Sequence, residues 1–176
     1  MNDPALLKTR IASAFSAARY PGDALLVNSQ EGTEPALLEQ EFKGKRDWHL
    51  LDAAFIDQAP DGFGSALSFF SHEAFRFYLP AYLIADLDQL LNRADPVFHL
   101  THGLDNASCK KLINPLRYGR KTWFAYAQER FATFSREESA EIAAYLTFKR
   151  DADPSSVPGD HSINEALDRY WAARAR

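Results

Sequence analysis

The chain has 176 residues, of which 46% are hydrophobic and 25% are charged, and these proportions exclude a disordered chain. Its formal net charge of -4 argues against broad attraction to nucleic-acid phosphates or anionic lipid. Cys109 is the only cysteine, so no intramolecular disulfide can form, and a lone thiol is typical of a reducing cytoplasm. The start lacks a signal-peptide pattern, and no uninterrupted apolar stretch is long enough to span a membrane. We therefore expect a cytoplasmic protein, with no membrane contact, that forms a single domain over residues 1–176.

The first half of the chain carries start and stop signals for short helices. Asp3-Pro4 is a cap followed by proline, which predicts a first helix that stops at residues 20–22. The stretch from Thr33 to Gly44 predicts a second helix, and Asp47 caps a third. Short helices with polar caps indicate a helical fold from the start of the chain.

The centre is the most ordered-looking part of the sequence. Ser71 is a good N-cap for a helix rich in aromatic rings that runs to Leu79. Pro80 disfavours a helical conformation for the residue before it and suits the first turn of a new helix. The sequence therefore predicts a break at Leu79-Pro80 and a second helix from Pro80 to about Arg93.

The second half repeats these signals. Asp95-Pro96 again pairs a cap with proline, and residues 123–134 have a helical pattern. Two capping boxes, Ser135 to Glu138 and Ser162 to Glu165, predict the starts of the last two helices. The prolines, serines and glycine of residues 151–160 predict a surface loop between them.

Together these elements predict an all-α fold, an irregular bundle of about seven or eight short helices with a proline-broken central helix pair. The alternative is an α+β fold with one small hairpin, because residues 25–27 and 67–70 are short strand candidates. The expected core is Trp48, Phe55, Phe75, Leu79, Leu83, Leu87, Ile142, Leu146 and Trp171.

Residues 67–83 read LSFFSHEAFRFYLPAYL, with a serine cap, a Glu-Ala-Phe element and a Tyr-Leu-Pro-Ala-Tyr-Leu element. This stretch resembles the signature LSFxSxEAFRxYLPAYL of an uncharacterised bacterial family known only as a domain of unknown function. Residues before it and the Tyr170-Trp171 pair near the end agree in order with the same family. The resemblance implies a small stand-alone bacterial protein, and it implies no reaction.

Polar and aromatic side chains cluster beside the predicted helix break, and we name them the central set. They are His72, Glu73, Arg76, Tyr78 and Tyr82. A carboxylate, a guanidinium and two phenols beside free backbone groups predict a site for an anion or a polar ligand. The structural interpretation is that Glu73 complements the helix dipole, that Arg76 pairs with it, and that the rings are core.

A second group of side chains is basic, with no acidic residue from 109 to 121. Its members are Lys110, Lys111, Arg117, Arg120 and Lys121. Interleaved aromatic residues would suit nucleic acid, but the acidic chain as a whole argues against that partner. A solvated face or an acidic protein partner is the competing interpretation.

Two further patterns suggest chemistry only weakly. His99 and His102 are three residues apart, near Asp95 and Asp105, and could share a metal ion, but no helical zinc motif is present. Cys109 precedes two lysines, which would lower a thiol pKa, but no catalytic partner can be placed. We expect no metal, no cofactor and no catalytic residues.

These observations favour a binding protein over an enzyme. The leading hypothesis is a small bacterial protein-interaction domain, either an immunity-like or antitoxin-like partner or an adaptor. The alternative is an enzyme or small-molecule binder with a site at the Ser71–Tyr82 break. A nucleic-acid binder that uses residues 110–121 is the third hypothesis. The sequence indicates neither the ligand nor the oligomeric state.

Overall fold

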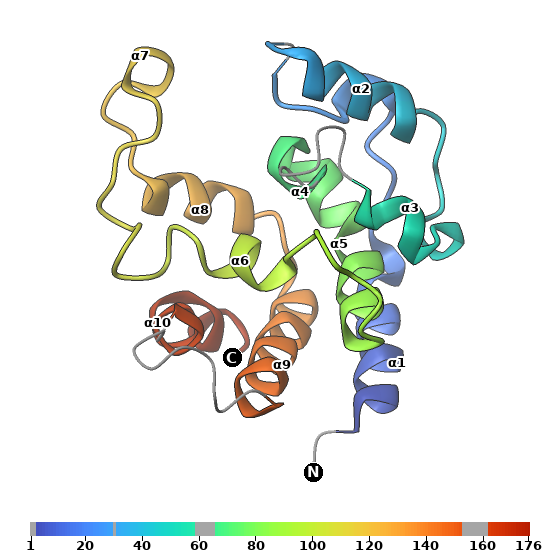
Figure 1. Cartoon of the computed structure of the whole chain (residues 1–176). Helices are drawn as coiled ribbons and strands as arrows, with labels where there is room; N and C mark the ends of the chain where they lie inside the picture. The colour runs from blue at the N-terminus through green and yellow to red at the C-terminus, as the bar shows by residue number, and fades with distance from the viewer. Residues whose placement is uncertain (1–2, 30, 59–65, 153–161) are drawn as a thin grey trace. The chain divides into compact units, whose positions relative to one another are not determined.

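The structure is a computed structural model that describes residues 3–29, 31–58, 66–152 and 162–176. These residues form helices and no sheet, which confirms the all-α prediction (Figure 1). Within them the helices number ten when α10, a π-turn and α11 are counted as the continuous helix they form, slightly above the predicted number. In the same residues, no helix has the length and apolar character needed to cross a membrane.

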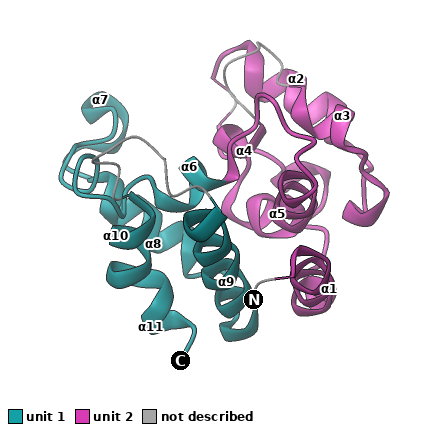
Figure 2. Cartoon of the chain, turned by 60° about the horizontal axis from the view of Figure 1, so that its bottom comes forward, with its two compact units in different colours: residues 1–2, 97–176 teal, residues 3–96 magenta. Residues whose placement is uncertain are grey.

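The chain divides into two compact units, one from Asp3 to Pro96 and the other containing Val97 to Arg176 (Figure 2). Each unit has its own buried residues. The helices of the first unit are α1 (Pro4–Ala14), α2 (Thr33–Phe42), α3 (Ala53–Asp57), α4 (Ala66–Phe69) and α5 (His72–Leu87). Helices α1 and α3 both pack against α5, which makes α5 the central element of this unit.

Helix α5 corrects the predicted break, because it runs without interruption through Pro80. Its start is as expected, with the Ser71 hydroxyl accepting a hydrogen bond from the Ala74 N–H at 2.9 Å. Proline inside a helix removes one hydrogen bond and costs about 3 kcal/mol. Eleven of the sixteen residues of α5 are buried, however, and the burial of apolar side chains on this scale outweighs that cost. Tertiary packing therefore decides the conformation at Pro80 against its local preference.

Helix α5 also ends earlier than predicted, at Leu87 and not near Arg93. Gln89 has a φ of 58°, and the Leu90 N–H donates to the Ala85 carbonyl at 3.0 Å. This is the Schellman arrangement, in which a left-handed residue closes the end of a helix. The sequence misled here because glutamine is an unusual residue at this position, where glycine is the common choice.

The two predicted strand segments do meet, although they form no sheet. Val27 and Phe70 make a single antiparallel bridge. Ser71 strengthens it, since its N–H donates to the Leu26 carbonyl at 2.9 Å and its hydroxyl donates to the Leu25 carbonyl at 2.6 Å. The small hairpin of the α+β alternative is thus reduced to one bridge in the described residues.

The second unit holds α6 (Pro96–Thr101), α7 (Pro115–Tyr118), α8 (Trp123–Phe131) and α9 (Arg136–Ala152), and it ends in α10 (Ser162–Ala166), a π-turn and α11 (Ala172–Arg174). The first capping box is confirmed. The Glu138 carboxylate accepts from the Ser135 N–H at 2.7 Å, and the Ser135 hydroxyl accepts from the Glu138 N–H at 3.2 Å. The loop predicted over residues 151–160 lies mostly outside the described residues.

The second predicted capping box marks the start of α10, whose first residue is Ser162. The Glu165 carboxylate turns to another segment and accepts a hydrogen bond from the Asn106 N–H at 2.7 Å. A carboxylate at a helix start can serve any nearby N–H group, so the local motif alone did not decide its partner.

The predicted core is largely confirmed. Eight of its nine members are buried, and Phe55 is half-buried. In the first unit the rings of Phe42, Phe70 and Tyr78 pack together, with centroids 4.9–5.0 Å apart. Such ring contacts add to the stabilisation that burial itself provides.

Asp57 fixes the chain that follows α5. Its carboxylate accepts hydrogen bonds from the N–H groups of Asn92, Arg93 and Ala94, at 2.8–2.9 Å. Partial burial opposes ionisation of this carboxyl, but the three N–H groups outweigh burial and lower its pKa. A lowered pKa means that the carboxylate stabilises the fold above the unfolded pKa of about 3.9, and that this contribution is lost as pH falls through the folded pKa.

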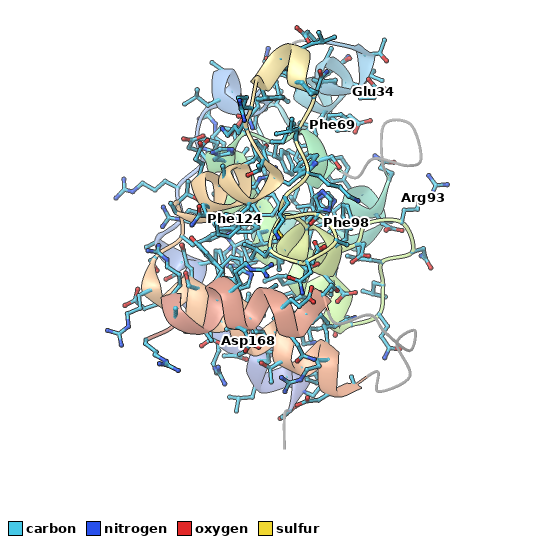
Figure 3. All side chains as sticks on the ribbon, turned by 90° about the vertical axis from the view of Figure 1, so that its left-hand side faces the viewer. Glu34, Phe69, Arg93, Phe98, Phe124 and Asp168 are labelled. Atoms are coloured by element: carbon cyan, nitrogen blue, oxygen red, sulfur yellow. The ribbon has the colours of Figure 1, made fainter. Side chains whose placement is uncertain are left out.

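We therefore expect Asp57→Asn to reduce the free energy of unfolding at pH 7 by on the order of 1 kcal/mol. The difference from the wild type should shrink as the pH falls below about 4, because the wild type then loses the same charge. Urea unfolding followed by circular dichroism between pH 3 and pH 7 measures it. Asp168→Asn at an exposed position is the matched control, and it should show little effect at any pH (Figure 3). A difference that does not change with pH would contradict the role given to the charge.

Candidate functional site

The five residues of the central set lie on α5, but the helix divides them between two faces. Glu73 is exposed, and His72 and Arg76 are half-buried. Tyr78 and Tyr82 are fully buried. Because an α-helix turns by about 100° per residue, Tyr78 and Tyr82 lie on a different face of α5 from Glu73 and Arg76, with His72 between the two faces. The structure therefore does not bring the five side chains together around one point.

The two tyrosines belong to the core of their unit. The Tyr78 hydroxyl donates a hydrogen bond to the Lys45 carbonyl at 2.7 Å. The Tyr82 hydroxyl is buried and has no hydrogen-bond partner among the residues the structure describes. Burial is the main cause that raises the pKa of both phenols far above the ordinary value, so both stay protonated near neutral pH. Neither hydroxyl is placed to exchange a proton with a ligand at the surface.

Continuity of α5 also removes the feature on which the predicted anion site depended. A new helix beginning at Pro80 would have presented free N–H groups and a positive dipole end. In the structure Pro80 lies inside a helix, and the N–H groups of the residues after it bond to carbonyls of the preceding turn. The ligand-binding alternative therefore has no helix terminus at this position.

The two histidines proposed as a metal pair lie among aromatic rings. His102 has its ring centroid 4.9 Å from that of Phe98 and 4.6 Å from that of Trp123. Burial, with a smaller effect of Arg130 and of His102, lowers the pKa of His99 to about 3, so this ring is neutral. Asp105 is engaged by the Ser108 N–H at 2.8 Å. Within residues 3–29, 31–58, 66–152 and 162–176, no three His, Cys, Asp or Glu side chains are grouped so that they could hold a metal ion.

The structure does bring the predicted basic residues into one segment, residues 109–123, which we call the basic loop. Leu112 and Thr122 form an antiparallel bridge at its base. The Ile113 N–H donates to the Lys121 carbonyl at 3.0 Å, and the Trp123 N–H donates to the Lys111 carbonyl at 2.9 Å. The loop is therefore closed, and α7 lies at its tip, extending beyond α8 in Figure 1.

The side chains of the basic loop are mostly in solvent. Lys110, Lys111, Arg117 and Arg120 are exposed. Lys121 is half-buried, forms an ion pair with Glu129, and lies over the Tyr126 ring at 5.6 Å. Exposed like charges on one short loop repel one another, so they do not stabilise this unit by themselves.

The basic loop also exposes two leucines that the sequence pattern did not single out. Leu116, in α7, is 99% exposed, and Leu112 is 48% exposed. The only signal in the sequence was a leucine directly after the Asn114-Pro115 turn, in a segment without helical period. Single exposed apolar residues are common, but a fully exposed leucine at the tip of a charged loop is not explained by the folding of the unit.

Gly103 attaches the base of the basic loop to the rest of its unit. Its φ is +87°, and a Cβ at this position would lie 2.6 Å from the Trp123 carbonyl oxygen. The Gly103 N–H donates to the Ser108 hydroxyl at 2.7 Å, and that hydroxyl donates to Asp105. Cys109 is half-buried beside this turn. These contacts are structural, because Ser108 donates directly to a carboxylate and not to a histidine.

In the part of the chain that the structure describes, helices without a sheet define an all-α protein, and its basic loop is an exposed surface feature. The chain belongs to a family of unknown function, DUF6714, whose model matches residues 30–175. This match confirms the resemblance to a family without an assigned function. No curated protein and no solved structure matches the chain.

Proposed function

We propose that this chain is a bacterial, cytoplasmic protein-interaction domain, an immunity-like or antitoxin-like partner that binds and occludes another protein. The observation that carries the proposal is the basic loop, which places positive charge and a fully exposed leucine on a chain that is otherwise acidic. Surfaces that combine exposed apolar side chains with charge of one sign mark sites of protein association. The lone cysteine and the resemblance to a bacterial family support the cellular setting.

The placement of the central set supports binding over catalysis. A general acid or base needs a pKa near the working pH, whereas the pKa of both tyrosines lies far above it. Tyr78 and Tyr82 are core residues, whereas Glu73 is exposed and His72 and Arg76 are half-buried. A protein that acts through an exposed surface requires none of these five side chains to converge.

The test is recovery and reconstitution of a complex from the native bacterial host. The full chain, carrying an affinity tag, is purified from the host at moderate salt, and co-purifying proteins are identified. We expect one protein in stoichiometric amount that forms the same complex again when both purified components are mixed, as measured by light scattering during gel filtration. Absence of any stoichiometric partner, or failure of the pair to reassociate, would contradict the proposed function.

A further inference from the structure

We propose that the basic loop is the docking element of this chain, and that its partner is a protein with an apolar pocket surrounded by acidic side chains. Leu116 enters the pocket, and the four exposed basic residues of the loop meet the acidic rim. This inference rests on the proposed function and adds the surface and the chemistry of the partner.

Hydrogen bonds within the chain alone already order the backbone of the basic loop. The bridge between Leu112 and Thr122 closes its base, and the Asn114 side chain caps α7 by accepting a hydrogen bond from the Leu116 N–H at 3.1 Å. The Tyr118 and Gly119 N–H groups donate to the Asn114 and Pro115 carbonyls at 2.9 and 3.0 Å. Because these bonds already order the backbone that carries Leu116, binding loses little conformational entropy in this segment.

Leu116 has the position of a binding anchor. Its side chain is 99% exposed, so it contributes no burial to the fold of its own unit. Transfer of such a side chain into an apolar pocket is favourable, and the few residues that dominate an interface are apolar or aromatic groups that fill pockets near its centre. Arg117 and Arg120 are exposed within four residues of it, which supplies a charged rim around the anchor.

The distribution of charge selects an acidic partner. The basic loop carries five basic residues and no acidic residue, whereas the rest of the chain carries fifteen basic and twenty-four acidic residues. An acidic surface would be attracted to the loop and repelled by the rest of the chain. That asymmetry favours docking by the loop and accelerates encounter at low salt.

Other polyanions fit the basic loop less well. Single-stranded nucleic acid would require free ring faces for stacking, but the residue at the tip is a leucine, and the Arg117 guanidinium lies 5.2 Å from the centre of the Tyr118 ring. An anionic membrane would meet one fully exposed leucine, and it would repel the acidic remainder of the chain.

A second copy of the chain also fits less well. A symmetric contact between two basic loops would place like charges opposite one another. A contact between the loop of one copy and an acidic surface of the next is head-to-tail, and it generates a ring or an open filament. A different protein meets neither difficulty.

The test begins with site-specific crosslinking of the full chain in the native host. Benzoylphenylalanine, a photo-crosslinker, replaces Leu116 in one sample and Leu50 in the control. Leu50 is 80% exposed and lies in the other unit, so it matches Leu116 in type and exposure. We expect one protein crosslinked through position 116 and not through position 50. That protein is then purified, and its affinity for the uncrosslinked chain is measured by calorimetry.

The affinity measurements show whether Leu116, the basic residues, both or neither contribute to binding of the partner. We expect Leu116→Ser to weaken binding by about ten-fold or more, and the pair K110E and R120E to weaken it by a similar factor and to reduce its salt dependence. Leu50→Ser should change it by less than about two-fold. All substituted positions are exposed, and circular dichroism verifies that each variant folds.

Several outcomes would overturn the inference. They are crosslinking at position 50 alone, a partner whose affinity is unchanged by Leu116→Ser, and a crosslink to a second copy of this chain. Purified chain that binds phosphatidylglycerol vesicles or a thymidine oligonucleotide, and loses that binding in the K110E and R120E variant, would assign the loop to lipid or nucleic acid instead. A stoichiometric partner whose affinity is unchanged by the substitutions in the basic loop would contradict this inference alone and leave the proposed function intact.

Discussion

Replacing Trp171 with alanine should reduce the free energy of unfolding by about 3–5 kcal/mol, as is typical for a fully buried tryptophan. Trp171 is 0% exposed, and its ring centroid lies 4.7 Å from that of Phe131 and 6.0 Å from that of Phe134. Its indole N–H donates to the Leu100 carbonyl at 2.9 Å. The side chain thus ties the end of the chain to α6 and α8, and its loss leaves both a cavity and an unsatisfied carbonyl.

Two further variants separate these causes. Trp171→Phe keeps a ring but removes the N–H, so we expect a loss of about 1–3 kcal/mol. Phe98→Ala serves as the control, because Phe98 is 50% exposed (Figure 3), and its loss should be clearly smaller than that of Trp171→Ala. Urea unfolding followed by far-ultraviolet circular dichroism measures all three without relying on tryptophan fluorescence. A loss below about 1 kcal/mol for Trp171→Ala would contradict the central position of this side chain.

Gly103→Ala should be the second severe substitution, with an expected loss of about 2–5 kcal/mol. Two independent causes contribute. The φ of +87° is strained for any residue with a Cβ, and that Cβ would lie 2.6 Å from the Trp123 carbonyl oxygen and 3.0 Å from the Ala127 Cβ. Relief of the clash requires a shift of the backbone at the start of α8, where the basic loop rejoins its unit.

Gly22→Ala is the matched control for the backbone strain. Gly22 has a φ of +97°, close to that of Gly103, but a Cβ there would meet nothing within 4 Å. We expect it to lose about 1 kcal/mol, from conformational strain alone. Comparison of the two variants by urea unfolding isolates the steric contribution at Gly103. Equal losses in both variants would show that the close approach to Trp123 does not matter for stability.

The candidate sites illustrate the limit of arguments from spacing. Tyr82 follows Pro80, and a helix break there would have changed its position relative to His72 and Arg76, which precede Pro80. Whether a break exists depends on how many side chains of α5 are buried, which is a property of the whole unit. The basic residues of 109–123 were grouped correctly because they are consecutive, but the exposure of Leu116 depends on the loop extending away from other elements.

The class of the fold, most helix starts and most of the core follow from the amino-acid sequence. Caps at Asp3, Ser71 and Ser135 act through hydrogen bonds within four residues, so local sequence is sufficient to place them. Asp47 caps only a 3-10 turn over Trp48–Leu50, and the helix expected from it begins instead at Ala53, capped by Asp52. Apolar periodicity likewise identifies core positions, because burial follows the period of the helix.

Where a local preference competes with packing, contacts between distant segments set the conformation. Pro80 stays inside a helix because most residues of α5 are buried. The chain after α5 is held by a hydrogen bond from the Asn92 N–H to Asp57, which lies thirty-five residues earlier in the sequence. The Glu165 carboxylate accepts a hydrogen bond from the N–H of Asn106, which is fifty-nine residues away in the sequence. In these cases packing or a hydrogen-bond partner distant in sequence adds to or overrides the local conformational preference.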